Sequence, residues 1–116
     1  MSKGKQKRKH IHRTSSFYQL ADVKQKISSG QCVIRQNAAN SALADFGWNR
    51  SDIIEAIKLL EERHFCMSIT SARNAWWAYD VYKARLFGEN IYIHLYIDDT
   101  AGMLIINSFK KDRPHY

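Results

Sequence analysis

The chain has 116 residues, of which 45% are apolar, and a formal net charge of +7 at pH 7. This length suits one domain, and the apolar fraction supports a core of ordinary size, so neither disorder nor stabilisation by disulfides is required. No apolar run approaches membrane-spanning length, and the N-terminus lacks the apolar segment of a signal peptide, so we expect a cytoplasmic protein without membrane contact.

The positive charge is concentrated at the N-terminus. Six of the 18 Lys and Arg residues and none of the 11 acidic residues occur before residue 14. We therefore expect residues 1–13 to form a flexible basic arm and residues 14–116 to form a single domain. Such an arm raises the affinity for a polyanion by counterion release, and the alternative is a solvated tail with no specific role.

Three helices are predicted in the first half of the domain. Leu20, Val23 and Ile27 recur at helical spacing, and Gly30 suits a C-terminal cap. Ser51 is a suitable N-cap for the helix with the broadest apolar stripe. The expected helices cover about residues 20–29, 37–46 and 51–63, with a short run over residues 31–35 between the first two.

From Phe65 onward the hydrophobic period changes to two, which is typical of strands. Phe65, Met67 and Ile69 alternate with Cys66, Ser68 and Thr70, and we expect the first three to share the buried side. The expected strands cover residues 64–70, 78–87, 90–97 and 103–110. Short connections rich in turn formers predict that the last three strands form an antiparallel meander. Helices followed by strands predict an α+β fold, with N-terminal helices packed on one face of an antiparallel sheet of about four strands.

The strand over residues 90–97 has two different faces. Ile91, Ile93, Leu95 and Ile97 alternate with Tyr92, His94 and Tyr96. The apolar face should contact the helices, which leaves the other face free for a ligand. The next strand places Lys110 and Lys111 close by, so this second face is the candidate functional surface.

The remaining reactive residues carry weaker signals. Cys32 and Cys66 each lie in an apolar, strand-like run, and we expect two buried thiols, in place of a disulfide or a redox pair. The five histidines are scattered without paired Cys/His spacing, so no metal site is expected. Trp76 and Trp77, beside Arg73, are either loop anchors or base-stacking platforms.

Several short motifs occur in a characteristic order. They are VKQKISSGQCVI, FGWNRSDIIEAIKLL, HFCMSIT, WAYDVYKARL, NIYIHL and MLIINSFKK, of which DVY (80–82) and SFK (108–110) are the most specific. Over about residues 20–111 this order resembles the MqsR family, mRNA interferase toxins of bacterial toxin–antitoxin systems that are similar in fold to the RelE group. The resemblance implies a RelE-like fold, cleavage of mRNA without a metal or cofactor, and silencing by a cognate antitoxin protein that also binds DNA.

The resemblance also implies site residues. Tyr92 and Lys110 match the family's functional tyrosine and lysine. At two further functional positions the family's lysine and glutamine correspond to Met67 and Tyr79 here. Either other groups have rebuilt the active site, or the chain binds RNA or a partner without cutting efficiently.

Cleavage of RNA by its own 2′-OH requires proton removal, stabilisation of the phosphorane charge and protonation of the departing 5′-oxygen. His94, with an ordinary pKa of about 6.5, is the best candidate for proton transfer. The alternative is that His94 is a surface residue on a solvated sheet face. Tyr92 and Lys110 complete the candidate catalytic set, and the candidate RNA-binding residues are Arg85, Lys83, Arg73, Lys111 and Tyr79. We therefore expect a metal-independent endoribonuclease toxin. The alternatives are a non-catalytic RNA- or DNA-binding module and a domain that sequesters an antitoxin-like partner.

Overall fold

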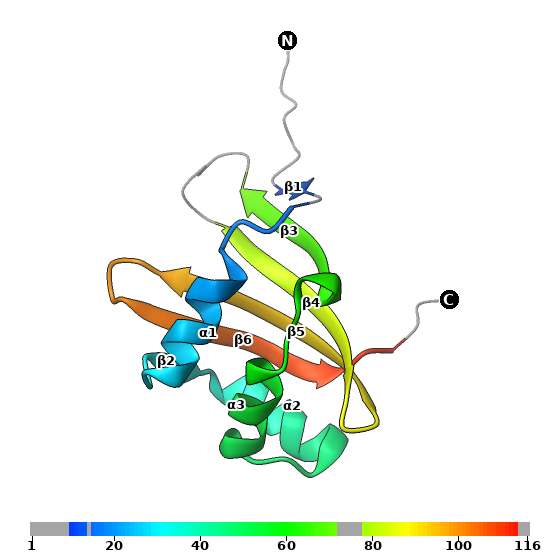
Figure 1. The fold of residues 1–116 in the computed structure, drawn as a ribbon. Coiled ribbons are helices and arrows are strands. Elements are labelled where there is room, and N and C mark those ends of the chain that lie inside the picture. The colour runs from blue at the N-terminus through cyan, green and yellow to red at the C-terminus, as the bar shows by residue number, and fades with distance from the viewer. Residues whose placement is uncertain (1–9, 14, 72–77, 114–116) are drawn as a thin grey trace.

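The computed structural model of the chain describes residues 10–13, 15–71 and 78–113. Within these residues, three α-helices lie against one face of a six-stranded sheet (Figure 1). The helices are α1 (Leu20–Ser28), α2 (Gln36–Phe46) and α3 (Arg50–Lys58), and a short 3-10 helix, η1, covers Glu62–His64. The strands are β1 (His10–Arg13), β2 (Cys32–Ile34), β3 (Phe65–Ser71), β4 (Ala78–Leu86), β5 (Glu89–Asp98) and β6 (Met103–Lys111). The predicted α+β class is confirmed.

The strand order is β1-β3-β4-β5-β6-β2. The antiparallel meander predicted for β4, β5 and β6 is confirmed, and β3 joins it through antiparallel pairing with β4. Two strands beyond the expected four extend the sheet, because β1 pairs with β3 and β2 pairs in parallel with β6. Residues 10–13, the end of the segment expected to be a basic arm, are thus part of the sheet. Residues 1–9 lie outside the described residues.

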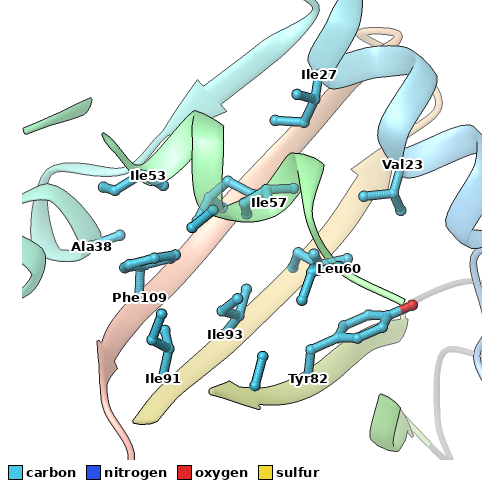
Figure 2. Packing of buried hydrophobic residues seen from close by; sticks show 14 of the residues in the cluster. Val23, Ile27, Ala38, Ile53, Ile57, Leu60, Tyr82, Ile91, Ile93 and Phe109 are labelled. Carbon is cyan, nitrogen blue, oxygen red and sulfur yellow. The ribbon is translucent and has the colours of Figure 1, made fainter. Parts of the chain in front are cut away.

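The core fills the space between the helices and the sheet. Val23 of α1 and Ile57 of α3 point toward Ile93 and Phe109 of the sheet, and all four are fully buried (Figure 2). The predicted apolar face of β5 is confirmed, because Ile91, Ile93 and Leu95 are buried and Ile97, although partly exposed, packs against the core. Burial of apolar area stabilises such a layer by about 25 cal/mol per Å². The helices therefore cover one face of the sheet and leave the other face to polar side chains.

The third helix begins earlier than predicted. Its N-cap is Asn49 and not Ser51: the Asn49 side chain accepts a hydrogen bond from the Asp52 N–H at 3.0 Å. The Asp52 carboxylate accepts one in return from the Asn49 N–H at 2.9 Å. This capping box satisfies two backbone donors at once, which a lone serine does not achieve. The helix ends at Lys58 and not near residue 63, and the chain then passes through η1 into β3.

A bulge in β3 reverses the predicted faces of this strand. The register with β4 shifts between Phe65 and Met67, so that Phe65 pairs with Tyr82 while Met67 pairs with its neighbour Val81. Phe65 packs on the core with its ring centroid 5.7 Å from that of Tyr82. Met67 is partly exposed on the opposite face. The prediction that Met67 shares the buried side with Phe65 is therefore wrong, because the extra residue of a bulge shifts the alternation that follows it.

The prediction of two buried thiols is also wrong. Cys66 lies in this bulge and is exposed, and Cys32 in β2 is only partly buried. Burial raises the pKa of the Cys32 thiol to about 11, which keeps it protonated at neutral pH. Both cysteines are free thiols.

The segment before α1 is attached to the sheet through Asp80 of β4. Asp80 is fully buried, and its two carboxylate oxygens accept hydrogen bonds from the backbone N–H groups of Phe17 and Tyr18, each at 2.9 Å. The Tyr18 hydroxyl donates to the carbonyl oxygen of Ala78 at 2.7 Å. Hydrogen bonds to a buried carboxylate are among the stronger ones in proteins. Asp80, the first residue of the DVY motif, therefore supports the fold.

Candidate functional site

The sheet face opposite the helices carries the side chains that the sequence singled out. The strand registers place on it Met67 and Ile69 of β3, Tyr79, Val81, Lys83 and Arg85 of β4, Tyr92, His94 and Tyr96 of β5, and Ser108 and Lys110 of β6. We call this surface the open face. It combines aromatic rings with basic groups, whereas the helix-covered face is apolar.

One cross-strand row on the open face contains Lys83, Tyr92 and Lys110. Tyr92 is the direct partner of Lys83 on β4 and of Lys110 on β6. Directly opposed side chains in antiparallel strands share one face and lie about 4.5–5.5 Å apart at Cβ. The Lys110 Nζ atom lies 5.2 Å from the Tyr92 ring centroid, within the range of a cation–π contact. In the strand register, Lys83 and Lys110 thus lie on either side of Tyr92.

A pocket of about 380 Å³ opens at this row. It is lined by Asp45, Tyr92, Lys110, Lys111, Asp112 and Arg113. Lys83 and Arg113 each have a carboxylate nearby, with Lys83 Nζ 3.6 Å from Asp112 and Arg113 Nη2 3.2 Å from Asp45. Among the described residues, no carboxylate lies within 4.0 Å of the Lys110 ammonium. In that part of the chain, no ion pair involves the Lys111 side chain either, so Lys110 and Lys111 are the cations of this pocket that are available to an anionic ligand.

His94 lies in the next row, with Val81 and Ser108 as its partners. The Tyr79 ring packs against the imidazole, with the two ring centroids 3.5 Å apart. Burial lowers the pKa of His94 to about 4, and the positive charge of Lys110 contributes in the same direction. The sequence-based expectation of an ordinary pKa is thus replaced by a neutral imidazole at pH 7, which is a weak proton acceptor.

The phenols of Tyr92 and Tyr79 are also uncharged. Burial raises the pKa of Tyr92, with smaller contributions from Cys66 and Asp112. Burial likewise raises the pKa of Tyr79, and the neighbouring Tyr92 adds to this effect. Both side chains are therefore protonated at neutral pH, which suits hydrogen-bond donation and stacking on a base.

The other candidate RNA-binding residues lie around this centre. Arg85 follows Lys83 on the same face of β4 and donates to the Asn90 side chain at 3.2 Å near the β4–β5 turn. Lys111 pairs with Ile91, so it follows Lys110 toward the other side of the strand, yet it still lines the pocket. Arg73, together with Trp76 and Trp77, lies outside the described residues.

A comparison with protein-family models gives a match over most of the chain. Residues 15–111 match the family described as motility quorum-sensing regulator, toxin of MqsA. The chain belongs to this MqsR toxin family. A search of curated proteins finds no match.

Tyr92 and Lys110 are the two residues that the sequence resemblance matched with the tyrosine and lysine of the MqsR toxin family. The structure brings them together, since they are direct partners across β5 and β6. It also places Met67 on the open face, in one cross-strand row with Val81 and His94. Sequence reasoning missed this placement of Met67. It also missed Asn107, whose amide nitrogen lies 3.3 Å from Nδ1 of His94, because no periodic signal marks either bulge.

The described residues were also compared with the requirements of a metal site and of a membrane-spanning helix. No group of three or more His, Cys, Asp and Glu side chains in residues 10–13, 15–71 and 78–113 is arranged to hold a metal ion. No helix in that part of the chain has both the length and the apolar character needed to cross a membrane.

Proposed function

We propose that this chain is the toxin of a type II toxin–antitoxin system and acts as a metal-independent endoribonuclease on mRNA. The observation that carries this proposal is the row on the open face in which Tyr92 lies between Lys83 and Lys110. Preorganised cations opposite a phosphoryl group stabilise the charge that develops in the transition state more than that of the ground state. Membership of the MqsR toxin family supports the same assignment.

In the proposed reaction the RNA 2′-oxygen attacks the adjacent phosphorus, and the bond from phosphorus to the 5′-oxygen of the next nucleotide breaks. The products are a 2′,3′-cyclic phosphate and a free 5′-hydroxyl. The 2′-OH proton leaves to water, and the Tyr92 phenol, which is protonated at neutral pH, donates a proton to the 5′-oxygen and regains one from water. Lys110 stabilises the phosphorane charge. His94, being neutral, contributes as a hydrogen-bonding group.

The residues around this centre would hold the RNA strand. Lys83 and Arg85 extend the positive charge along β4, and Lys111 extends it at the end of β6. Tyr79 offers an aromatic ring beside the phosphate position, and single-stranded RNA is bound by stacking of its unpaired bases on such rings. Arg73 stays an expected contact from the sequence alone.

The experiment that tests the reaction uses two RNA oligonucleotides of the same sequence. A single 2′-deoxy nucleotide on the 5′ side of the cut removes the attacking hydroxyl, so this RNA should bind with similar affinity and resist cleavage. EDTA should leave the cleavage rate of the all-ribose RNA unchanged. Cleavage of the 2′-deoxy RNA, or a loss of activity in EDTA that a divalent ion restores, would contradict the mechanism.

RNA binding without cleavage is the second candidate function. It is favoured by Met67, which places a thioether on the open face where the resemblance predicts a lysine, and by the neutral state of His94. The same oligonucleotides separate the two functions. Stable binding of the all-ribose RNA with no product over hours would select the non-catalytic function.

We further propose that the partner protein is an antitoxin of the MqsA kind, as the description of the family indicates, and that the chain acts in the cytoplasm, where mRNA is located. Induction of the chain should arrest growth, and co-expression of a small DNA-binding protein encoded by the adjacent gene should relieve the arrest. Continued arrest despite a soluble, co-expressed neighbour would contradict this partnership.

A further inference from the structure

A second bulge adjoins His94. The register between β5 and β6 shifts after this residue: His94 pairs with Ser108, but Leu95 pairs with Ile106, which leaves Asn107 as the extra residue. The backbone of this bulge is held from α2, because the Asn37 side chain donates to the carbonyl oxygen of Asn107 at 2.9 Å. Bulges are common beside active sites, where they redirect a side chain. Here the redirected side chain is the Asn107 amide.

The contact between Asn107 and His94 determines which ring nitrogen carries the proton. The Asn107 Nδ2 atom lies 3.3 Å from Nδ1 of His94. In this orientation of the Asn107 amide its nitrogen faces the ring, and because an amide nitrogen donates and does not accept, Nδ1 is then the unprotonated acceptor. A neutral imidazole carries one proton, which is then on Nε2. Among the described residues, Nε2 is buried and has no hydrogen-bond partner.

We propose that Asn107 is a positioning residue that holds His94 as a neutral imidazole with its proton on Nε2, and that this N–H donates a hydrogen bond to an oxygen of bound RNA. The second half of this proposal rests on the proposed function. A buried donor without a partner is costly, and such groups in native proteins commonly have a functional role. An RNA oxygen would supply the missing acceptor.

The surroundings of the ring favour the neutral form. The groups that face the imidazole are the Tyr79 phenol from β4 and the Asn107 amide and Lys110 ammonium from β6. The ammonium opposes a second proton on the ring, and neither of the other two groups offers a negative charge at neutral pH. Because Tyr79 packs on the imidazole, contact between an RNA oxygen and Nε2 requires the Tyr79 ring to move.

The tautomer can be measured on the free protein. In ¹⁵N-histidine-labelled full-length chain, long-range ¹H–¹⁵N correlation distinguishes the two tautomers and the charged ring, and the spectrum of His94→Gln assigns the His94 signals. We expect the Nε2–H tautomer between pH 8 and pH 5. A proton on Nδ1, or half-protonation near pH 6.5, would overturn the assignment.

A charge-switching variant tests the role of Asn107. Asn107→Asp replaces the donor by an acceptor, so the His94 proton should move to Nδ1 and the His94 pKa should rise by at least about one unit. Asn40→Asp, at an exposed position of α2, adds the same charge away from the ring and should change neither. Should Asn107→Asp fail to fold, Asn107→Ala should yield a mixture of the two tautomers. An unchanged tautomer in whichever variant folds would overturn the positioning role.

RNA binding tests whether the His94 Nε2–H donates a hydrogen bond to RNA. Titration of the wild-type chain with the 2′-deoxy RNA should shift the His94 Nε2 signal, and Asn107→Ala should bind this RNA several-fold more weakly than Asn40→Asp does. A chain that binds and cleaves RNA without any shift of Nε2 would refute the donor role while leaving the proposed function intact. A chain with the Nε2–H tautomer that binds no RNA would refute the proposed function while leaving the positioning role intact.

Discussion

The Lys110 ammonium lies 5.2 Å from the centre of the Tyr92 ring, and the two residues are direct partners across β5 and β6. This relationship depends on the register of the two strands. Because side chains alternate between the faces of a sheet, a slip of one residue would move Lys110 to the helix-covered side. The candidate site is therefore a property of the paired strands and not of either motif alone.

Lys110→Ala should lower the rate of RNA cleavage by about 10²-fold, because a preorganised cation opposite the phosphorane charge is lost. The free energy of unfolding should hardly change, since Lys110 is exposed. Single-turnover kinetics and urea unfolding measure the two quantities. Lys58→Ala, at an exposed position of α3, is the matched control and should retain the wild-type rate. Wild-type cleavage by folded Lys110→Ala would place catalysis elsewhere.

Met67→Lys should fold and bind RNA more tightly. A lysine at this partly exposed position can lay its stem over Val81 while its ammonium group reaches water. One new phosphate contact should steepen the slope of log K against log salt by about 0.7. Ala44→Lys adds the same charge on an exposed part of α2 and should leave the slope unchanged. Unfolding of Met67→Lys would contradict the position of Met67 on the open face.

The free energy of unfolding should decrease as the pH falls between the pKa values of His94 in the unfolded and the folded chain. The pKa of His94 is about 4 in the folded chain, where burial lowers it, against about 6.5 in the unfolded chain. Between these values the unfolded state binds more protons, so the free energy of unfolding decreases as the pH falls through this range.

Urea unfolding at pH 7 and pH 4.5 measures this loss, which should be smaller for His94→Gln than for the wild type. Burial also lowers the pKa of His64, so His64→Gln provides a separate comparison. Equal losses for the wild type and His94→Gln would mean that His94 titrates alike in both states.

Asp80→Ala should destabilise the fold by about 2 kcal/mol, because it removes a buried carboxylate that accepts hydrogen bonds from the partly buried N–H groups of Phe17 and Tyr18. Asp99→Ala removes a carboxylate from an exposed position and should cost little. Urea unfolding compares the two variants. A small loss for Asp80→Ala would show that the segment before α1 does not depend on this carboxylate.

Deletion of residues 1–9 should weaken RNA binding and flatten its salt dependence while leaving the cleavage position unchanged. The deletion removes Lys3, Lys5, Lys7, Arg8 and Lys9 but retains β1. Counterion release makes the slope report the number of phosphates neutralised, and such contacts carry no sequence information. Equal salt dependence with and without residues 1–9 would exclude contact between this segment and RNA phosphates. A change in the cleavage position would show that the segment contacts the bases.

The sequence by itself determined the layers of the fold and the character of the two faces of β5. Both depend on patterns within one segment: Val23 and Ile27 recur at helical spacing, and Ile93 alternates with Tyr92 and His94. The sequence therefore predicted the helical half, the meander and the polar side of β5. Partial exposure of Tyr92 and His94 agrees with this prediction.

Only the tertiary structure decided the side of Met67, the pKa of His94 and the place of Asn107. Both bulges are mismatches between two paired strands, so the alternation of apolar and polar residues within one strand does not predict them. The pKa of His94 is set by burial beneath Tyr79 and by the charge of Lys110, which come from two other strands. Patterns local to one segment predict its own faces, whereas register, burial and electrostatic environment arise from the segments packed around it.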